Sequence, residues 1–119
     1  MKSTNNTIKI AIPIAEGRLC AHFGHCGQFA VIVADKDGKT ILSREELTPP
    51  PHEPGVLPAW LAKMGVQIVF AGGMGRRAQE LFGLSGIDVL VGLPSETPER
   101  LVEDYFAGVL APGENICDH

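Results

Sequence analysis

One short segment of the sequence gathers side chains that bind metals. Cys20, His22, His25 and Cys26 place four soft or borderline ligands within seven residues. Their spacing is not that of a standard zinc finger, and buried cysteines are often inert apolar groups, so ligation and a purely structural role both stay open. The chain ends in Cys117-Asp118-His119, which could add ligands or fray. The candidate metal ligands are Cys20, His25, Cys26, Cys117 and His119.

A second segment has the composition of an anion site. Gly72-Gly73-Met74-Gly75 stands between an apolar strand pattern and a helical pattern that begins with Arg76-Arg77. Free amides and the positive end of the dipole at a helix N-terminus favour an anion, and glycines let the backbone approach it. The segment matches neither GxGxxG nor GxxxxGK[ST], so a nucleotide gains no support. A tight turn that only packs the helix on the strand is the alternative.

A third segment, 49–55, reads PPPHEPG and holds His52 between prolines. Restricted backbone lowers the entropic cost of presenting a side chain. A single loop histidine is more often merely solvated. We expect His52 to act only if this loop lies beside the other two.

The elements that must position these loops follow from the apolar pattern. Continuous apolar runs predict strands at 8–14, 28–34, 40–47, 66–71 and 87–91, with Asp37-Gly38 as a hairpin turn and Pro13 near the end of the first strand. Helical spacing predicts three helices, which begin near residues 56, 76 and 98 and end at Gly65, Gly83 and Gly108. Thr97-Pro98-Glu99 is typical of a helix start.

The order of these elements predicts an α/β domain. A hairpin followed by two right-handed crossovers gives a five-stranded mixed sheet of order 3-2-1-4-5, with strand 2 antiparallel, which resembles the ribonuclease H-like fold. Ligands in such sheets bind beyond the carboxyl ends of the central strands. We therefore expect the loops 15–27, 48–55 and 72–77 to converge there.

Composition limits the class of protein. The 119 residues, 45% of them hydrophobic, predict one domain over 8–108 between a flexible N-terminus, 1–7, and a tail, 109–119. A net charge of −4 argues against nucleic acid. The sequence lacks an apolar run that would cross a membrane, and it begins without a secretion signal, so we expect a cytoplasmic protein. Three cysteines favour reduced thiols or ligands over a disulfide scaffold.

Enzymatic chemistry has little support in the sequence. The central strand patterns IKIAIPI and VQIVFA carry none of the carboxylates that a two-metal nuclease needs. There is no GxSxG, and nothing supplies an oxyanion-hole motif for a cysteine nucleophile. We predict a protein that is not an enzyme.

Four segments together resemble a known family. Residues 20–24, 50–55, 72–78 and 113–119 are similar to the dinitrogenase iron-molybdenum cofactor-binding family, which includes NifX, the C-terminal domain of NifB and the orange protein. The resemblance covers nearly the whole chain. It implies a carrier or accessory protein for an anionic molybdenum-containing metal-sulfur cluster, either an iron-molybdenum precursor or a molybdenum-copper sulfide. The implied cluster-binding residues are His22, Phe23, Gly24, His52, Gly72, Gly73, Met74, Gly75, Arg76 and Arg77, with Phe23 and Met74 on an apolar rim.

Other functions stay open at this point. The alternatives are a protein-interaction or regulatory module without a cluster, and a zinc or iron-sulfur protein. The sequence does not identify the cargo, partners in cluster assembly or oligomeric state. It does show that residues 95–119 carry six acids and one arginine, a net charge of −5. We expect the acidic last helix to face away from an anion site, because like charge would oppose binding.

Overall fold

The computed structural model describes residues 6–20, 27–50 and 55–110. The strands are β1 (Thr7–Ala15), β2 (Arg18–Leu19), β3 (Gln28–Asp35), β4 (Thr40–Leu47), β5 (Ile68–Phe70) and β6 (Asp88–Leu90). The helices are α1 (Val56–Lys63), α2 (Arg76–Leu84) and α3 (Pro98–Ala107). Within the described residues, none of these helices has the length and apolar character to span a membrane.

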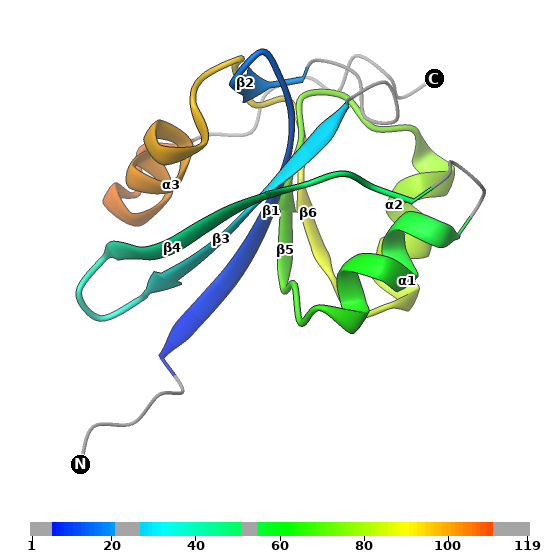
Figure 1. The fold of residues 1–119 in the computed structure, drawn as a ribbon, viewed down its shortest axis with the longest axis horizontal. Coiled ribbons are helices and arrows are strands. Elements are labelled where there is room, and N and C mark those ends of the chain that lie inside the picture. The colour runs from blue at the N-terminus through cyan, green and yellow to red at the C-terminus, as the bar shows by residue number, and fades with distance from the viewer. Residues whose placement is uncertain (1–5, 21–26, 51–54, 111–119) are drawn as a thin grey trace.

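One mixed sheet organises the molecule (Figure 1). Its order is β4-β3-β1-β5-β6, with β2 attached to β1 off this path. β3 is antiparallel to β1 and β4, whereas β5 is parallel to β1 and to β6. The prediction of five strands is wrong, because it did not include the short β2. The strands after β2 are therefore numbered one higher than in the prediction. The five expected segments nevertheless lie beside their expected neighbours.

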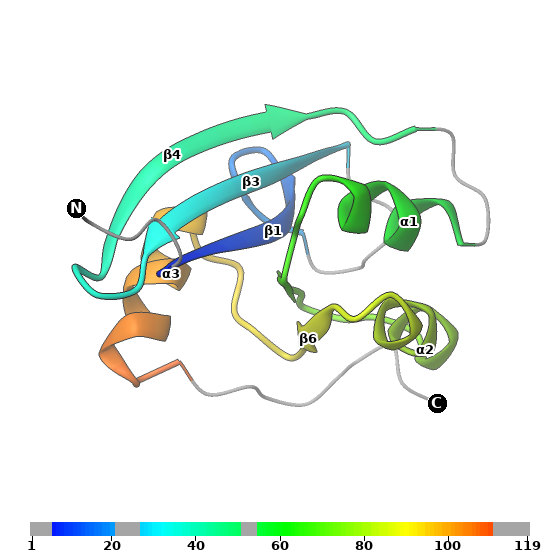
Figure 2. The ribbon, with the colours of Figure 1, turned by 90° about the horizontal axis from the view of Figure 1, so that it is seen from below.

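The sheet is covered on both faces, so the fold has three layers (Figure 2). Successive side chains of a strand point to opposite faces. Ile10 and Ile12 of β1 therefore pack with Leu101 and Val102 of α3, while Ala11 packs with the cluster that includes Leu61 of α1 and Phe82 of α2. A central strand buried on both faces explains why IKIAIPI is almost continuously apolar.

The short β2 is formed by a hairpin that follows β1 directly. Glu16 and Gly17 have φ angles of 55° and 81°, the left-handed values that a two-residue turn of this kind requires. Pro13 lies near the end of β1 as expected, two residues before the last strand residue, Ala15. β5 pairs with β1 only at Ile10 and Ala11, so the missing N–H of Pro13 falls beyond the parallel ladder.

Two of the three predicted helix ends are confirmed. Gly65 and Gly108 follow α1 and α3 with φ angles of 85° and 76°. Gly83 was the wrong terminator for α2, because the helix continues to Leu84 and the left-handed residue is Gly86, with φ 78°. The N-cap of α3 is as predicted, with the Thr97 hydroxyl accepting a hydrogen bond from the Arg100 amide at 3.3 Å.

An ion pair joins α3 to the outer strand β4. Arg44 of β4 donates hydrogen bonds to Glu99 of α3 and, at 2.7 Å, to Glu46. The hydrogen bond to Glu99 raises the pKa of Arg44. Partial burial on its own would raise the pKa of Glu99, but the hydrogen bond and charge of Arg44 leave it below its usual value. The helix is thereby fixed on this face by polar as well as apolar contacts.

The two glycines near the end of α2 make a matched pair for a stability test. A methyl group at either position meets open space, so only the backbone conformation differs. Gly83→Ala should raise the free energy of unfolding by about 0.5–1 kcal/mol, since glycine is a poor helix former. Gly86→Ala should lower it by about 1–2 kcal/mol, because its φ is left-handed. Urea unfolding measures both; a stabilising Gly86→Ala would contradict this helix end.

The Arg44–Glu99 pair predicts a pH-dependent contribution to stability. The folded-state pKa of Glu99 is lowered, so its contribution is present above about pH 4.3 and is lost as the pH falls through that lowered pKa. Glu99→Gln should cost about 0.5 kcal/mol at pH 7, a modest value because the Glu99 side chain is 41% exposed. The difference from wild type should vanish near pH 2. Glu103→Gln on the same helix is the control, and an equal effect there would rule out a specific pair.

Candidate functional site

One edge of the sheet collects the stems of the three predicted loops. Ile14 at the end of β1 pairs with Gln28 at the start of β3, and Phe29 pairs with Leu47 at the end of β4. β5 is parallel to β1, so the turn after Phe70 leaves from the same edge (Figure 1). The described stems thus converge as expected. The histidines that were expected at this edge, His22 and His52, lie outside the described residues.

The glycine turn after β5 is held from within the fold. Gly72 accepts a hydrogen bond from the Gly92 amide at 2.6 Å, and the Met74 carbonyl accepts one from Nε2 of Gln79 at 2.9 Å. Gly72 and Gly73 are buried, whereas Gly75 is exposed. The Met74 side chain is 0% exposed and packs in the core cluster of α1 and α2. The expectation that Met74 forms an apolar rim is therefore wrong.

The start of α2 concentrates positive charge. Gly75 is the N-cap in an extended conformation and, in the described part of the chain, no side chain caps the helix there. Arg76 and Arg77 occupy the first turn, are exposed, and stand at the positive end of the helix dipole. By contrast, α3 starts with a capping threonine and Glu99. The first turn of α2 therefore combines the positive end of the helix dipole with two arginine charges, which is the kind of electrostatic environment that favours anions.

Cys20 directly follows β2 at the same edge of the sheet. It is 9% exposed, its amide donates to the carbonyl of Pro13 at 2.9 Å, and its sulfur is in a disulfide. A disulfide must be reduced before its sulfur can act as a thiolate ligand, so metal ligation by Cys20 stays a prediction. Within 6–20, 27–50 and 55–110, no three His, Cys, Asp or Glu side chains form a metal-binding group. The other predicted site residues outside these ranges are Phe23, Gly24, His25, Cys26, Cys117 and His119.

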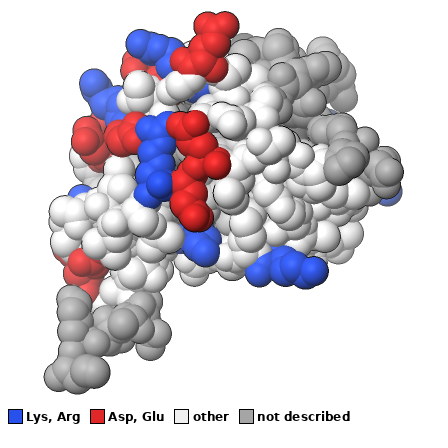
Figure 3. Space-filling view, in the orientation of Figure 1, with Lys and Arg blue, Asp and Glu red and all other residues white. Residues whose placement is uncertain are grey.

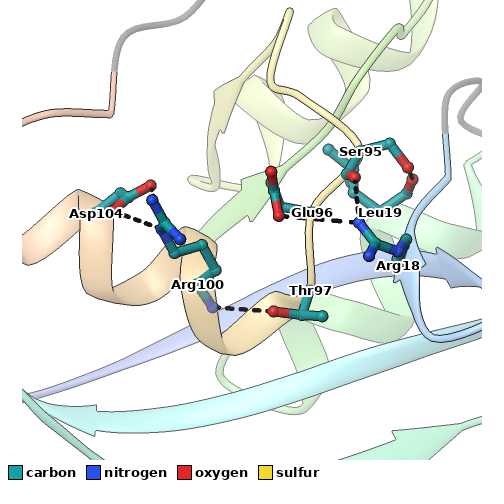
Figure 4. A network of polar contacts seen from close by, with 7 residues as sticks. All are labelled: Arg18, Leu19, Ser95, Glu96, Thr97, Arg100 and Asp104. Carbon is teal, nitrogen blue, oxygen red and sulfur yellow. Dashed lines mark hydrogen bonds and ion pairs between the residues drawn. The ribbon is translucent and has the colours of Figure 1, made fainter.

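A hydrogen-bonded segment at this edge, residues 92–96, was not predicted from the sequence. Residues 92–96, between β6 and α3, contact both the glycine turn and β2. Leu19 donates its amide to the Glu96 carbonyl at 2.9 Å, and the Ser95 hydroxyl donates to the Leu19 carbonyl at 3.0 Å (Figure 4). The Gly92-x-Pro94-Ser95 pattern marks a turn, but its partners are distant in sequence.

The acidic helix lies away from the arginines of α2. α3 packs on one face of the sheet and α2 on the other. Glu99 binds Arg44, and Asp104 accepts hydrogen bonds from Arg100 at 3.2 Å. In the view of Figure 3 the charged side chains gather on the side of β4 and α3. The expected separation of the acidic helix from the candidate anion site is confirmed for Glu99 and Asp104.

Comparison with known families shows to which family the chain belongs. The model of the dinitrogenase iron-molybdenum cofactor family matches residues 6–108, which include every helix and strand described above. The chain belongs to this family. The match spans the glycine turn, the arginines of α2 and the 92–96 segment. No curated protein sequence matches this chain closely enough to count as a relative.

Solved structures of other proteins have the same fold as this chain. PH0822 is 28% identical, with a TM-score of 0.78 over 89% of this chain and 96% of that one. MJ0327 from Methanocaldococcus jannaschii is 14% identical, with a TM-score of 0.70 over 92% and 97%. The apo form of the orange protein from Desulfovibrio gigas is 23% identical, with a TM-score of 0.69 over 90% and 93%. The chain therefore spans the fold of these neighbours almost completely.

The positive charge at the start of α2 predicts that a substitution to a negative residue there stabilises the protein without ligand. Arg77→Glu replaces a repelled cation with an anion that the helix dipole attracts. We expect the free energy of unfolding to rise by roughly 0.5–1 kcal/mol in low salt and the gain to shrink in 1 M NaCl. Thermal and urea unfolding measure this, with Arg77→Gln as an intermediate control. Destabilisation by Arg77→Glu would show that the arginine serves the fold.

Proposed function

We propose that this protein binds and carries an anionic, molybdenum-containing metal-sulfur cluster at the loop edge of its sheet, as a non-catalytic carrier or accessory protein in the cytoplasm. The family match supports a cofactor of the iron-molybdenum kind or its precursor. The alternative cargo is a molybdenum-copper sulfide, as the resemblance to the orange protein implies. This cluster is also an anion. The sheet order supports a ribonuclease H-like fold for the domain.

The observation that carries this proposal is the uncapped, doubly cationic start of α2. A sulfide-rich cluster is a large, soft anion, which backbone amides bind through oriented dipoles and arginines bind through charge-assisted hydrogen bonds. Gly75, at the N-cap, presents backbone without a side chain, and Arg76 and Arg77 follow it. Electrostatic holding of a preformed cluster would account for two arginines at a helix N-terminus, where positive charge is unfavourable for the helix dipole.

The disulfide at Cys20 favours this mode over thiolate ligation by that residue. Because the Met74 side chain is buried, we propose that this segment binds the cluster through the backbone of the glycine turn and through the two arginines. His22, Phe23, Gly24 and His52 are proposed to complete the site from the neighbouring loops, as the family resemblance implies.

Reconstitution with thiomolybdate and copper, and separately with iron and sulfide, tests the proposal. Arg76→Ala or Arg77→Ala should weaken uptake by about 1–3 kcal/mol, the value of a charge-assisted hydrogen bond. Arg100→Ala is the matched control, because it removes an arginine from the opposite face of the sheet. Visible absorption, elemental analysis and titration measure binding. Equal binding by all variants for every cargo would refute the site.

Gly75→Asp distinguishes loss of binding from loss of folding. The N-cap has an extended backbone, φ −64° and ψ 156°, and a new Cβ there meets open space. An aspartate would cap the helix with its own carboxylate, so the free protein should keep or gain a few tenths of a kcal/mol of stability. The same carboxylate should repel the cluster. If Cys20→Ser abolishes uptake while Gly75→Asp does not, direct sulfur ligation replaces electrostatic holding.

A further inference from the structure

We propose that residues 92–96 set the spacing between the two halves of the cluster site, and that Ser95 is a positioning residue for binding. The two halves are the glycine turn, residues 72–75, and the end of β2 at Leu19 with the adjoining Cys20. The inference rests on the proposed function for its binding measurement, but the coupling between the two halves is testable in the protein without ligand.

The segment is attached to the glycine turn by its first two residues. The Gly92 amide donates to the Gly72 carbonyl at 2.6 Å, and the Leu93 amide donates to the Ala71 carbonyl at 3.2 Å. These bonds continue the pairing of β6 with β5 into the loop region. Any shift of Gly92 therefore moves the start of the turn that leads to Arg76.

The other end of the segment is attached to β2, directly before Cys20. The Glu96 carbonyl accepts the Leu19 amide at 2.9 Å, and the Ser95 hydroxyl donates to the Leu19 carbonyl at 3.0 Å. Figure 4 shows the Ser95–Leu19 contact together with Arg18, whose guanidinium donates to the Ser95 carbonyl at 3.1 Å. Both backbone groups of Leu19 are thus bound by one short segment.

The segment between these attachments is stiff. Gly92 has a left-handed φ of 76°, Leu93 is 6% exposed and packs in the core of the α3 face, and Pro94 restricts the backbone. The Glu96 amide donates to the Pro94 carbonyl at 2.9 Å, which closes a tight turn around Ser95. A rigid connection of this kind transmits position from one loop to the other.

Ser95 is the informative residue among these contacts. A side-chain substitution removes none of the backbone donors or acceptors, and the Arg18–Glu96 pair, 3.8 Å apart with side chains 57% and 45% exposed, contributes little. The Ser95 hydroxyl is the side-chain bond that fixes Leu19 directly, although Ser95 belongs to neither cluster-binding loop. Its loss should loosen the geometry of the site without removing a group that touches the cluster.

The experiment compares wild type, Ser95→Ala, Ser95→Thr and the control Ser43→Ala, an exposed serine on β4. Amide hydrogen exchange in the ligand-free protein is the first measurement. Ser95→Ala should speed exchange at Leu19 and at Gly92, since a coupled segment loosens at both ends, while the Gln67 amide, bonded to Lys9, should be unchanged. Ser95→Thr keeps a hydroxyl and should restore the wild-type rates. Loosening at Leu19 alone would overturn the coupling.

Binding of thiomolybdate with copper is the second measurement. Ser95→Ala should bind about 2- to 10-fold more weakly, the range expected for one neutral hydrogen bond, and its visible circular dichroism should broaden. Ser43→Ala should match wild type. Wild-type loading with an unchanged Ser95→Ala overturns the positioning role and leaves the proposed function intact. If wild type takes up no cluster, the proposed function fails, and the exchange rates alone decide whether the segment couples the loops.

Discussion

Burial of β1 on both faces is the constraint on which the rest of the structure depends. Ile10 and Ala11 are neighbours in sequence, point to opposite faces and are both 0% exposed. Two helical layers are therefore required, and each strand edge of β1 must find a hydrogen-bonding partner. β3 supplies one through a hairpin topology, and β5 supplies the other in parallel, which requires a crossover through α1.

That parallel pairing also creates the candidate site. Because β1 and β5 run in the same direction, the turn after β5 and the hairpin after β1 emerge at one edge, and the 92–96 segment lies against both. The N-terminus of α2 follows the turn, so helix amides and two arginines meet there. Under the proposed function, two cations at the positive end of a helix dipole would exchange some helix stability for anion binding.

Charge is divided between the two faces of the same sheet. The acids of α3 bind Arg44 and Arg100 on one face, and the cationic start of α2 belongs to the other. The sheet therefore separates the negative charges of α3 from the positive charges of α2, whose electrostatic fields would otherwise partly cancel. The anionic cargo of the proposed function would therefore bind away from the acidic helix.

The sequence alone determined the features that depend on neighbouring residues. Apolar runs identified the five strands other than β2. Thr97 and Gly108 marked the two ends of α3, and the glycines before Arg76 predicted a turn into a helix. Tertiary structure decided the burial of Met74, the formation of β2 and the hydrogen bond from Ser95 to Leu19. Met74 turns inward because α1 and α2 enclose a space for it, and Ser95 acts on a residue 76 positions earlier. Such contacts depend on the closure of the whole chain, which local periodicity does not encode.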